Sequence, residues 1–100
     1  MYLHMIRIEW DEQKNEANIA KHGIDFAMAK LVFEDPFCIT FVERIIDGEQ
    51  RWHAIGSIEK IMIAVVVHTY RDEGPDEIIR IVSARRATRK ERTLYVETVG

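Results

Sequence analysis

The residues best suited to chemistry gather near the end of this chain, in positions 83–92, SARRATRKER. Five basic residues stand here beside a single acidic residue, Glu91: Arg85, Arg86, Arg89, Lys90 and Arg92. Guanidinium groups bind carboxylates and phosphates through paired hydrogen bonds, so this composition predicts a site for an anion. Two structural explanations stay open: the arginines are merely solvated, or they pair with carboxylates of a protein partner.

The same stretch is expected to open a helix, because Thr88 and Glu91 match the T-x-x-E pattern of a capping box. A helix N-terminus carries a partial positive charge and unpaired N–H groups, so Arg89 and Lys90 are unfavourable there without a bound anion. A phosphate would reverse the sign of these interactions. The helix start therefore strengthens the prediction of an anion site.

Two histidines elsewhere in the chain are further candidates. His68 follows an apolar run in VVVHTYR, and an imidazole titrates near neutral pH, as proton transfer requires. A satisfied histidine at the edge of the core is the alternative for His68. Lys21 and His22 close an expected helix, where cations are favourable for structural reasons alone.

An expected strand over residues 50–57, QRWHAIGS, supplies another arginine. Alternation directs Arg51 and His53 to one face of this strand and Trp52 to the other face, towards the core. The four histidines and one cysteine show neither H-x-x-x-H nor C-x-x-C spacing. Glycine-rich nucleotide motifs and nucleophile signatures are also missing from the sequence. We therefore expect no metal and no cofactor, and a site that binds and polarises phosphate with arginine and histidine.

The elements that must position these residues are predicted by caps, turns and hydrophobic periodicity. Asp11 and Asp25 are expected to cap two helices, Gly23 to end the first, and Asp47-Gly48 to form a tight turn. In chain order the pattern predicts a strand, two helices, four strands and a helix over 5–10, 12–22, 26–34, 37–44, 50–57, 60–71, 77–85 and 88–99. Short turns between strands indicate a small antiparallel sheet with the helices packed on one side, an α+β fold.

Size and composition indicate a single domain over residues 1–100, with 47% hydrophobic and 31% charged residues. One cysteine excludes an internal disulfide, no apolar run reaches the length of a membrane span, and no signal peptide is recognised. A cytoplasmic protein is expected. The net charge is −3, yet six basic and two acidic residues lie from Arg80 onward, which favours a localised anion-binding surface.

Four segments in order resemble the BrnT family, the toxin component of type II toxin–antitoxin systems: IEWDEQKNEANIAKHGIDFAMAKLVFEDP, DGEQRWHAIG, VVHTYR and IRIVSARRATRKERTLY. The likeness runs from about Ile6 to Tyr95. It implies a RelE-like fold and a ribonuclease that inhibits translation by cutting RNA. It also implies a neutralising antitoxin, usually a ribbon-helix-helix DNA-binding protein, so that DNA is contacted only through the complex.

For such an enzyme we expect metal-independent cleavage, with the adjacent 2′-hydroxyl as nucleophile. Arg51 and Arg85 are expected to stabilise the transition state, and His68 to transfer a proton. Lys21 and His22 are alternatives to His68 or bind RNA phosphate, if the end of the first helix approaches that face. The remaining contacts to the RNA backbone are expected from Arg86, Arg89 and Arg92. The competing interpretation is a non-catalytic subunit or corepressor that only holds an acidic antitoxin segment.

Overall fold

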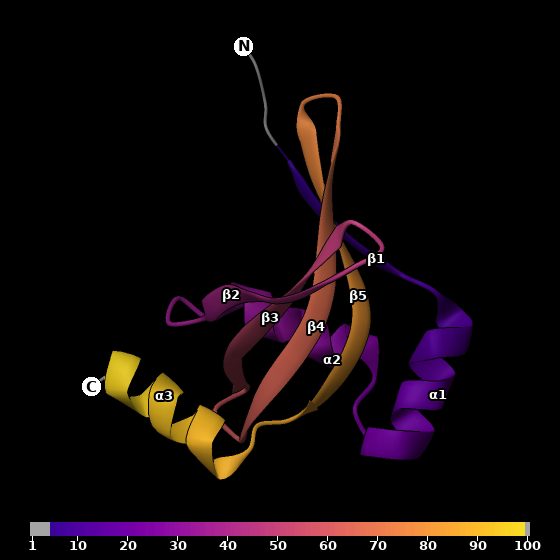
Figure 1. Ribbon diagram of the computed structural model, residues 1–100. Helices are drawn as coiled ribbons and strands as arrows, with labels where there is room; N and C mark the ends of the chain where they lie inside the picture. The colour runs from indigo at the N-terminus through magenta and orange to yellow at the C-terminus, as the bar shows by residue number, and fades with distance from the viewer. Residues whose placement is uncertain (1–4, 100) are drawn as a thin grey trace.

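The structure is a computed structural model, and it describes residues 5–99. Its elements are β1 (Ile6–Trp10), α1 (Glu12–His22), α2 (Phe26–Ala29), the 3₁₀ helix η1 (Lys30–Glu34), β2 (Ile39–Ile46), β3 (Glu49–Ile58), β4 (Met62–Glu73), β5 (Asp76–Arg86) and α3 (Arg89–Val99). The five strands form one sheet in the order β1-β5-β4-β3-β2 (Figure 1). No helix of residues 5–99 is long and apolar enough to cross a membrane.

The sheet is mixed, so the prediction of an entirely antiparallel sheet is wrong for one strand. Strands β2 to β5 form the expected antiparallel meander, but β1 pairs in parallel with β5. Parallel neighbours need a long connection, and here α1 and α2 lie between β1 and the rest of the sheet. The chain thereby reaches the far edge at β2, and β5 returns last to lie beside β1.

Local caps set the ends of the helices as predicted. The Asp11 carboxylate accepts hydrogen bonds from the backbone N–H groups of Gln13 and Lys14, and Gly23 ends α1 with φ of 72°. The predicted second helix is instead a single turn of α2 followed by η1. Phe26, Ala29 and Val32 are fully buried at a spacing of three, which the three-residue turn of a 3₁₀ helix keeps on one face.

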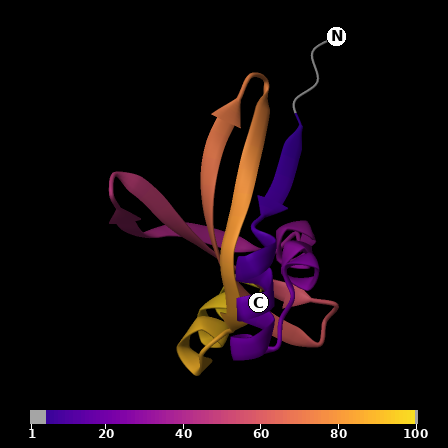
Figure 2. The same cartoon turned by 90° about the vertical axis from the view of Figure 1, so that its right-hand side faces the viewer.

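The sheet is covered on both faces, so the prediction that all helices pack on one side is wrong. Ala54, Ala64 and Val66 belong to a core shared with Phe26 and Val32 of the N-terminal helical segments. The adjacent residues of the strands point the other way: Ile55 and Val65 pack with Tyr95 of α3. Figure 2 shows α3, in yellow, and the violet N-terminal helices on opposite sides of β5. The face covered by α3 is called the α3 face below.

A buried side chain ties α1 to the sheet. The amide of Asn18 donates to the carbonyl oxygens of Ile24 and Ala84 over 2.8 Å each, and its oxygen accepts from the Ala84 N–H over 3.0 Å. Asn18 is only 6% exposed, so these bonds replace water that it has lost. The end of β5 is therefore held in place just before the basic stretch.

Candidate functional site

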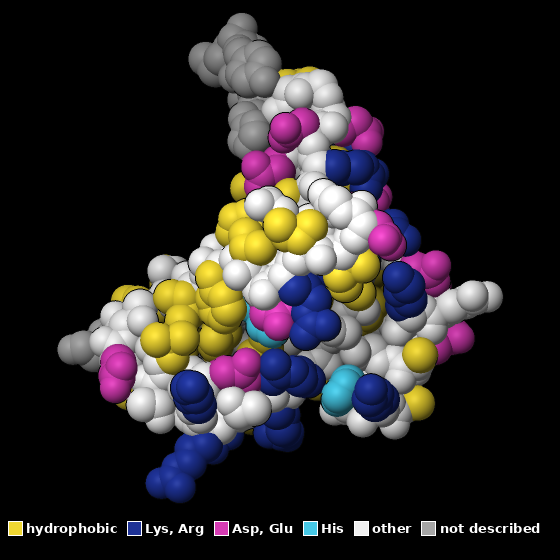
Figure 3. All heavy atoms as spheres, in the orientation of Figure 1, with side chains coloured by type: hydrophobic (Ala, Val, Ile, Leu, Met, Phe, Trp, Pro, Cys, Tyr) yellow, Lys and Arg dark blue, Asp and Glu magenta, His cyan; other side chains and the backbone are white. Residues whose placement is uncertain are grey.

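The strand register brings His53 and Arg85 to the same face of the sheet. Ile55 and Arg85 both pair with Val65, while His53 pairs with Val67, the next residue along β4 on this face. Because Ile55 and Val65 contact α3, His53 and Arg85 also lie on the α3 face. Figure 3 shows basic, acidic and histidine side chains meeting near the middle of the molecule, beside a hydrophobic surface.

Arg85 is held by the first turn of α3. Its two terminal nitrogens donate to the two carboxylate oxygens of Glu91 over 2.7 and 3.0 Å. Glu91 and Thr88 also form the predicted capping box, with the Thr88 N–H at 2.8 Å from Glu91 Oε1 and the Glu91 N–H at 3.2 Å from Thr88 Oγ1. The hydrogen bond from Arg85 is the main cause that lowers the pKa of Glu91 to about 2. Glu91 thereby fixes the orientation of the guanidinium, and only the remaining N–H groups of Arg85 are left for a phosphate.

His53 lies between an acid and an aromatic ring, both from β2. Its Nε2 is 3.9 Å from Glu43 Oε2, and its ring centroid is 5.6 Å from that of Phe41. Burial lowers the pKa of His53, the Glu43 carboxylate opposes this, and Arg85 adds to the lowering. The imidazole is therefore mostly neutral at pH 7, which is the form that accepts a proton.

Arg51 lies two residues before His53 on the same side of β3. Its side chain is 22% exposed, and Nη2 is 3.5 Å from Glu49 Oε1. The Arg51 Nε is buried and has no hydrogen-bond partner among the described residues. This donor is therefore unsatisfied within the described part of the chain. The sheet thus places the two predicted arginines, Arg51 and Arg85, on one face together with His53.

The structure does not bring His68 into this group. His68 is fully buried on the opposite face, where its ring lies edge-on to Phe33 at 4.9 Å and to Tyr70 at 5.0 Å. Its Nδ1 is 3.1 Å from the Val66 carbonyl oxygen, and burial lowers its pKa to about 4. Alternation along β4 explains this position, because Val66 and His68 share one face while Val67 lies on the other. We therefore do not retain His68 for proton transfer.

The other predicted phosphate contacts are divided between the two faces. Arg86 pairs with Ala64, whose side chain lies in the core under the N-terminal helices, so Arg86 is directed away from Arg85. Lys21 and His22 form the last turn of α1, and no hydrogen bond or ion pair within residues 5–99 joins them to the His53–Arg85 group. Arg89 and Arg92 lie on α3 and are exposed.

Sequence reasoning missed the contribution of β2. Glu43 stands at a bulge, where the pairing with β3 shifts between Val42 and Arg44. Strict alternation along ITFVERII does not reveal such an insertion. The signal that was present is the spacing of Arg51 and His53, which already placed both on one face.

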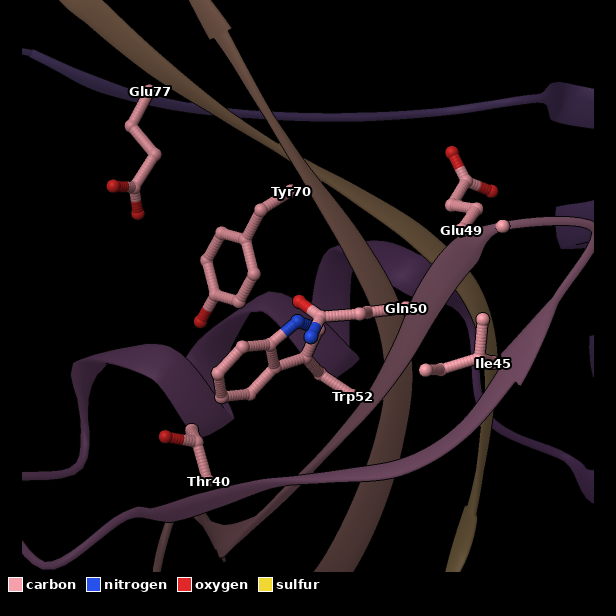
Figure 4. A pocket seen from close by; sticks show the side chains of 8 residues that line it. Thr40, Ile45, Glu49, Gln50, Trp52, Tyr70 and Glu77 are labelled. Atoms are coloured by element: carbon pink, nitrogen blue, oxygen red, sulfur yellow. The ribbon is translucent and has the colours of Figure 1, made fainter.

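A cavity of about 890 Å³ lies outside this group, and Figure 4 shows it from close by. Trp52 and Tyr70 meet edge-on in it, with ring centroids 5.1 Å apart, and Gln50 and Thr40 add polar groups. Its lining, as far as the structure describes it, contains carboxylates but no lysine or arginine. It is therefore a poorer candidate for binding phosphate than the α3 face.

Among residues 5–99, no group of three or more His, Cys, Asp or Glu side chains lies close enough together to hold a metal ion. What the α3 face offers is a neutral imidazole, guanidinium groups and a nearby carboxylate. Such a set can accept a proton and stabilise a developing negative charge.

Comparisons with known proteins show which family the chain belongs to. A family model described as "Ribonuclease toxin, BrnT, of type II toxin-antitoxin system" matches residues 10–91. The 1.1 Å crystal structure of the Brucella abortus ribonuclease toxin BrnT is 31% identical in sequence, with a TM-score of 0.60 over 85% of this chain and 99% of that chain. None of the curated protein sequences compared with the chain matches it. The chain therefore belongs to the BrnT family of ribonuclease toxins from type II toxin–antitoxin systems.

Proposed function

We propose that this protein is a metal-independent endoribonuclease whose active site is the group of Arg51, His53 and Arg85 on the α3 face. The observation that carries this proposal is the placement of a neutral, partly accessible imidazole beside oriented guanidinium groups. Membership of the family supports the reaction class, and the geometry supports the choice of residues.

The proposed reaction is an attack of the 2′-oxygen on the adjacent phosphorus. His53 accepts the proton of the 2′-hydroxyl while the bond from the 2′-oxygen to phosphorus forms and the bond from phosphorus to the 5′-oxygen breaks. Arg85 and Arg51 donate hydrogen bonds to the non-bridging oxygens, where negative charge accumulates. The 5′-oxygen leaves with a proton from water, so the products are a 2′,3′-cyclic phosphate and a 5′-hydroxyl.

The decisive experiment measures cleavage of a labelled single-stranded RNA by the purified chain, with excess chelator and with added magnesium. We expect equal activity in both, because no step uses a metal. His53→Ala and Arg85→Ala should each lower kcat/KM by about 100-fold or more. The matched controls are His22→Ala and Arg86→Ala, which remove the same side chains outside the proposed site. Unchanged cleavage by a folded His53→Ala protein would remove His53 from the mechanism.

The pH dependence provides an independent test of the role of His53. Because burial lowers the pKa of His53 below its ordinary value of 6.5, the proton-accepting form persists at slightly acidic pH. We expect the acid-side decline of kcat/KM to have its midpoint below pH 6.5. The residual activity of His53→Ala should lack this decline. A decline centred above pH 6.5 contradicts the assignment.

The same proposal extends to the biology that the family implies. RNA cleavage would inhibit translation in the cytoplasm, and the antitoxin partner, of the ribbon-helix-helix type, would neutralise the toxin by covering its arginines. A RelE-like character of the fold is part of this proposal. Expression of the chain with and without its antitoxin tests inhibition and neutralisation, with growth and protein synthesis as the measurements.

A second candidate function is a non-catalytic subunit that binds an acidic segment of the antitoxin. It is favoured by the Arg85–Glu91 pair, because this guanidinium already donates hydrogen bonds to a carboxylate. Purified protein distinguishes the two functions. A folded chain that binds the antitoxin but neither cuts RNA nor slows growth on induction would support the second.

A further inference from the structure

A groove adjoins the His53–Arg85 site, between α3 and the β2–β3 hairpin. Its volume is about 740 Å³. The lining consists of Phe41, Ile55, Arg89, Lys90, Glu91, Thr93, Leu94 and Glu97. Two of these residues also belong to the site, since Phe41 lies against the His53 ring and Glu91 binds Arg85. A ligand that occupies the site can therefore continue into the groove.

We propose that this groove binds the base of a nucleotide next to the cleaved phosphate, and that the substrate is single-stranded RNA. This inference rests on the proposed ribonuclease function and adds the part of the substrate that the groove holds. A base in a duplex is already stacked and paired, so only an unpaired nucleotide can stack the face of its base on a protein side chain.

The walls of the groove suit a nucleobase. Phe41 and Leu94 are 37% and 45% exposed, so both present apolar surface to a ligand. Stacking of a base on an aromatic side chain contributes about 1–3 kcal/mol and tolerates any base, since every base has a π-face. Phe41 is 5.6 Å from His53 between ring centroids. A base stacked on Phe41 would thus lie beside the imidazole that acts on its own sugar or on that of its neighbour.

The charges at the rim distinguish this groove from a purely apolar protein-binding surface. Arg89 and Lys90 line it and form no ion pair within the described part of the chain. By contrast, Arg71 and Arg80 elsewhere on the same face both pair with Glu9. Arg89 and Lys90 are therefore free to meet a neighbouring phosphate of the RNA beside the groove. Glu97 also lines the groove and repels a further phosphate, which favours a single nucleotide.

Binding of short 2′-O-methyl oligonucleotides tests the proposal without cleavage, because the nucleophile is blocked. We expect Phe41→Ala to weaken single-strand binding between about 5-fold and about 150-fold, with the salt dependence unchanged. Phe41→Trp should retain affinity. The double variant Arg89→Ala/Lys90→Ala should reduce the slope of log affinity against log salt by about 1.4. Phe37→Ala is the matched control, since Phe37 is 50% exposed and lies outside the groove.

The outcomes show whether single-stranded RNA or the antitoxin occupies the groove. Equal affinity of Phe41→Ala and Phe37→Ala for the single strand overturns the proposal, as does equal affinity of the wild type for single-stranded and duplex RNA. If Phe41→Ala loses the antitoxin but keeps RNA, the groove belongs to the protein partner and the proposal is also overturned. Weaker RNA binding by Phe41→Ala supports the groove even if His53→Ala still cleaves. That combination would refute the catalytic assignment instead.

Discussion

Replacing Glu91 with glutamine separates the two roles of this side chain. Glutamine at this position still completes a capping box with Thr88, because its side chain also accepts hydrogen bonds. It carries no charge, however, and cannot form the ion pair with both terminal nitrogens of Arg85. Any loss of stability in Glu91→Gln therefore reports mainly on the pair with Arg85.

The size of the effect follows from the pKa of Glu91, which Arg85 chiefly lowers from 4.5 to about 2. The folded protein binds this proton less readily than the unfolded chain, so the pair stabilises the fold fully above pH 4.5 and loses this stabilisation as pH falls through about 2. Between pH 4.5 and pH 2, the stabilisation of the fold falls by about 1.4 kcal/mol for each pH unit. The contribution is therefore at most about 3 kcal/mol at pH 7 and about 1 kcal/mol at pH 3.

Urea unfolding followed by tryptophan fluorescence measures this contribution at both pH values. We expect Glu91→Gln to be less stable than the wild type by about 2–3 kcal/mol at pH 7. At pH 3 this loss of stability should be smaller by about 2 kcal/mol. Glu97→Gln is the matched control on the same helix and should be close to neutral. The reasoning fails if the stability difference caused by Glu91→Gln is the same at both pH values, or if Glu97→Gln reproduces it.

Three further substitutions test how the site is supported, each by urea unfolding. Gly56→Ala would place a Cβ 2.9 Å from Val32 Cγ1, so we expect a loss of about 1–3 kcal/mol; wild-type stability would mean that η1 yields easily. Tyr95→Phe removes the hydroxyl that donates to Asp35 and should cost about 1–2 kcal/mol, and no cost would show that this bond is replaced by water. Asn18→Ala should cost about 3 kcal/mol and speed amide exchange at the end of β5, and slow exchange there would contradict its role.

Much of the secondary structure was predictable because its signals are local. Asp11 and Gly23 set the two ends of α1 through contacts within one turn, and the capping box at Thr88 starts α3 in the same way. The Asp47-Gly48 turn was also predicted, and both residues have the positive φ values, 50° and 79°, that a tight hairpin turn requires. Each of these features depends on residues a few positions apart.

The candidate site was predictable only in part. Arg51 and Arg85 were recognised as anion-binding residues, and alternation placed His53 on the same face as Arg51, but the sequence did not single out His53 for proton transfer. Alternation does not say which face a given helix covers. His68 was therefore chosen for proton transfer, although η1 covers it and burial lowers its pKa to about 4.

The sequence by itself determined the turns, the helix ends and the concentration of arginine near the last strand, because these depend on neighbours in the chain. Only the tertiary structure decided that β1 joins β5 in parallel, that α3 covers the face opposite α1, and that His53 rather than His68 lies with Arg85. These are choices between faces and edges of the sheet. They depend on which distant apolar surfaces pack best together, and no short-range pattern records that competition.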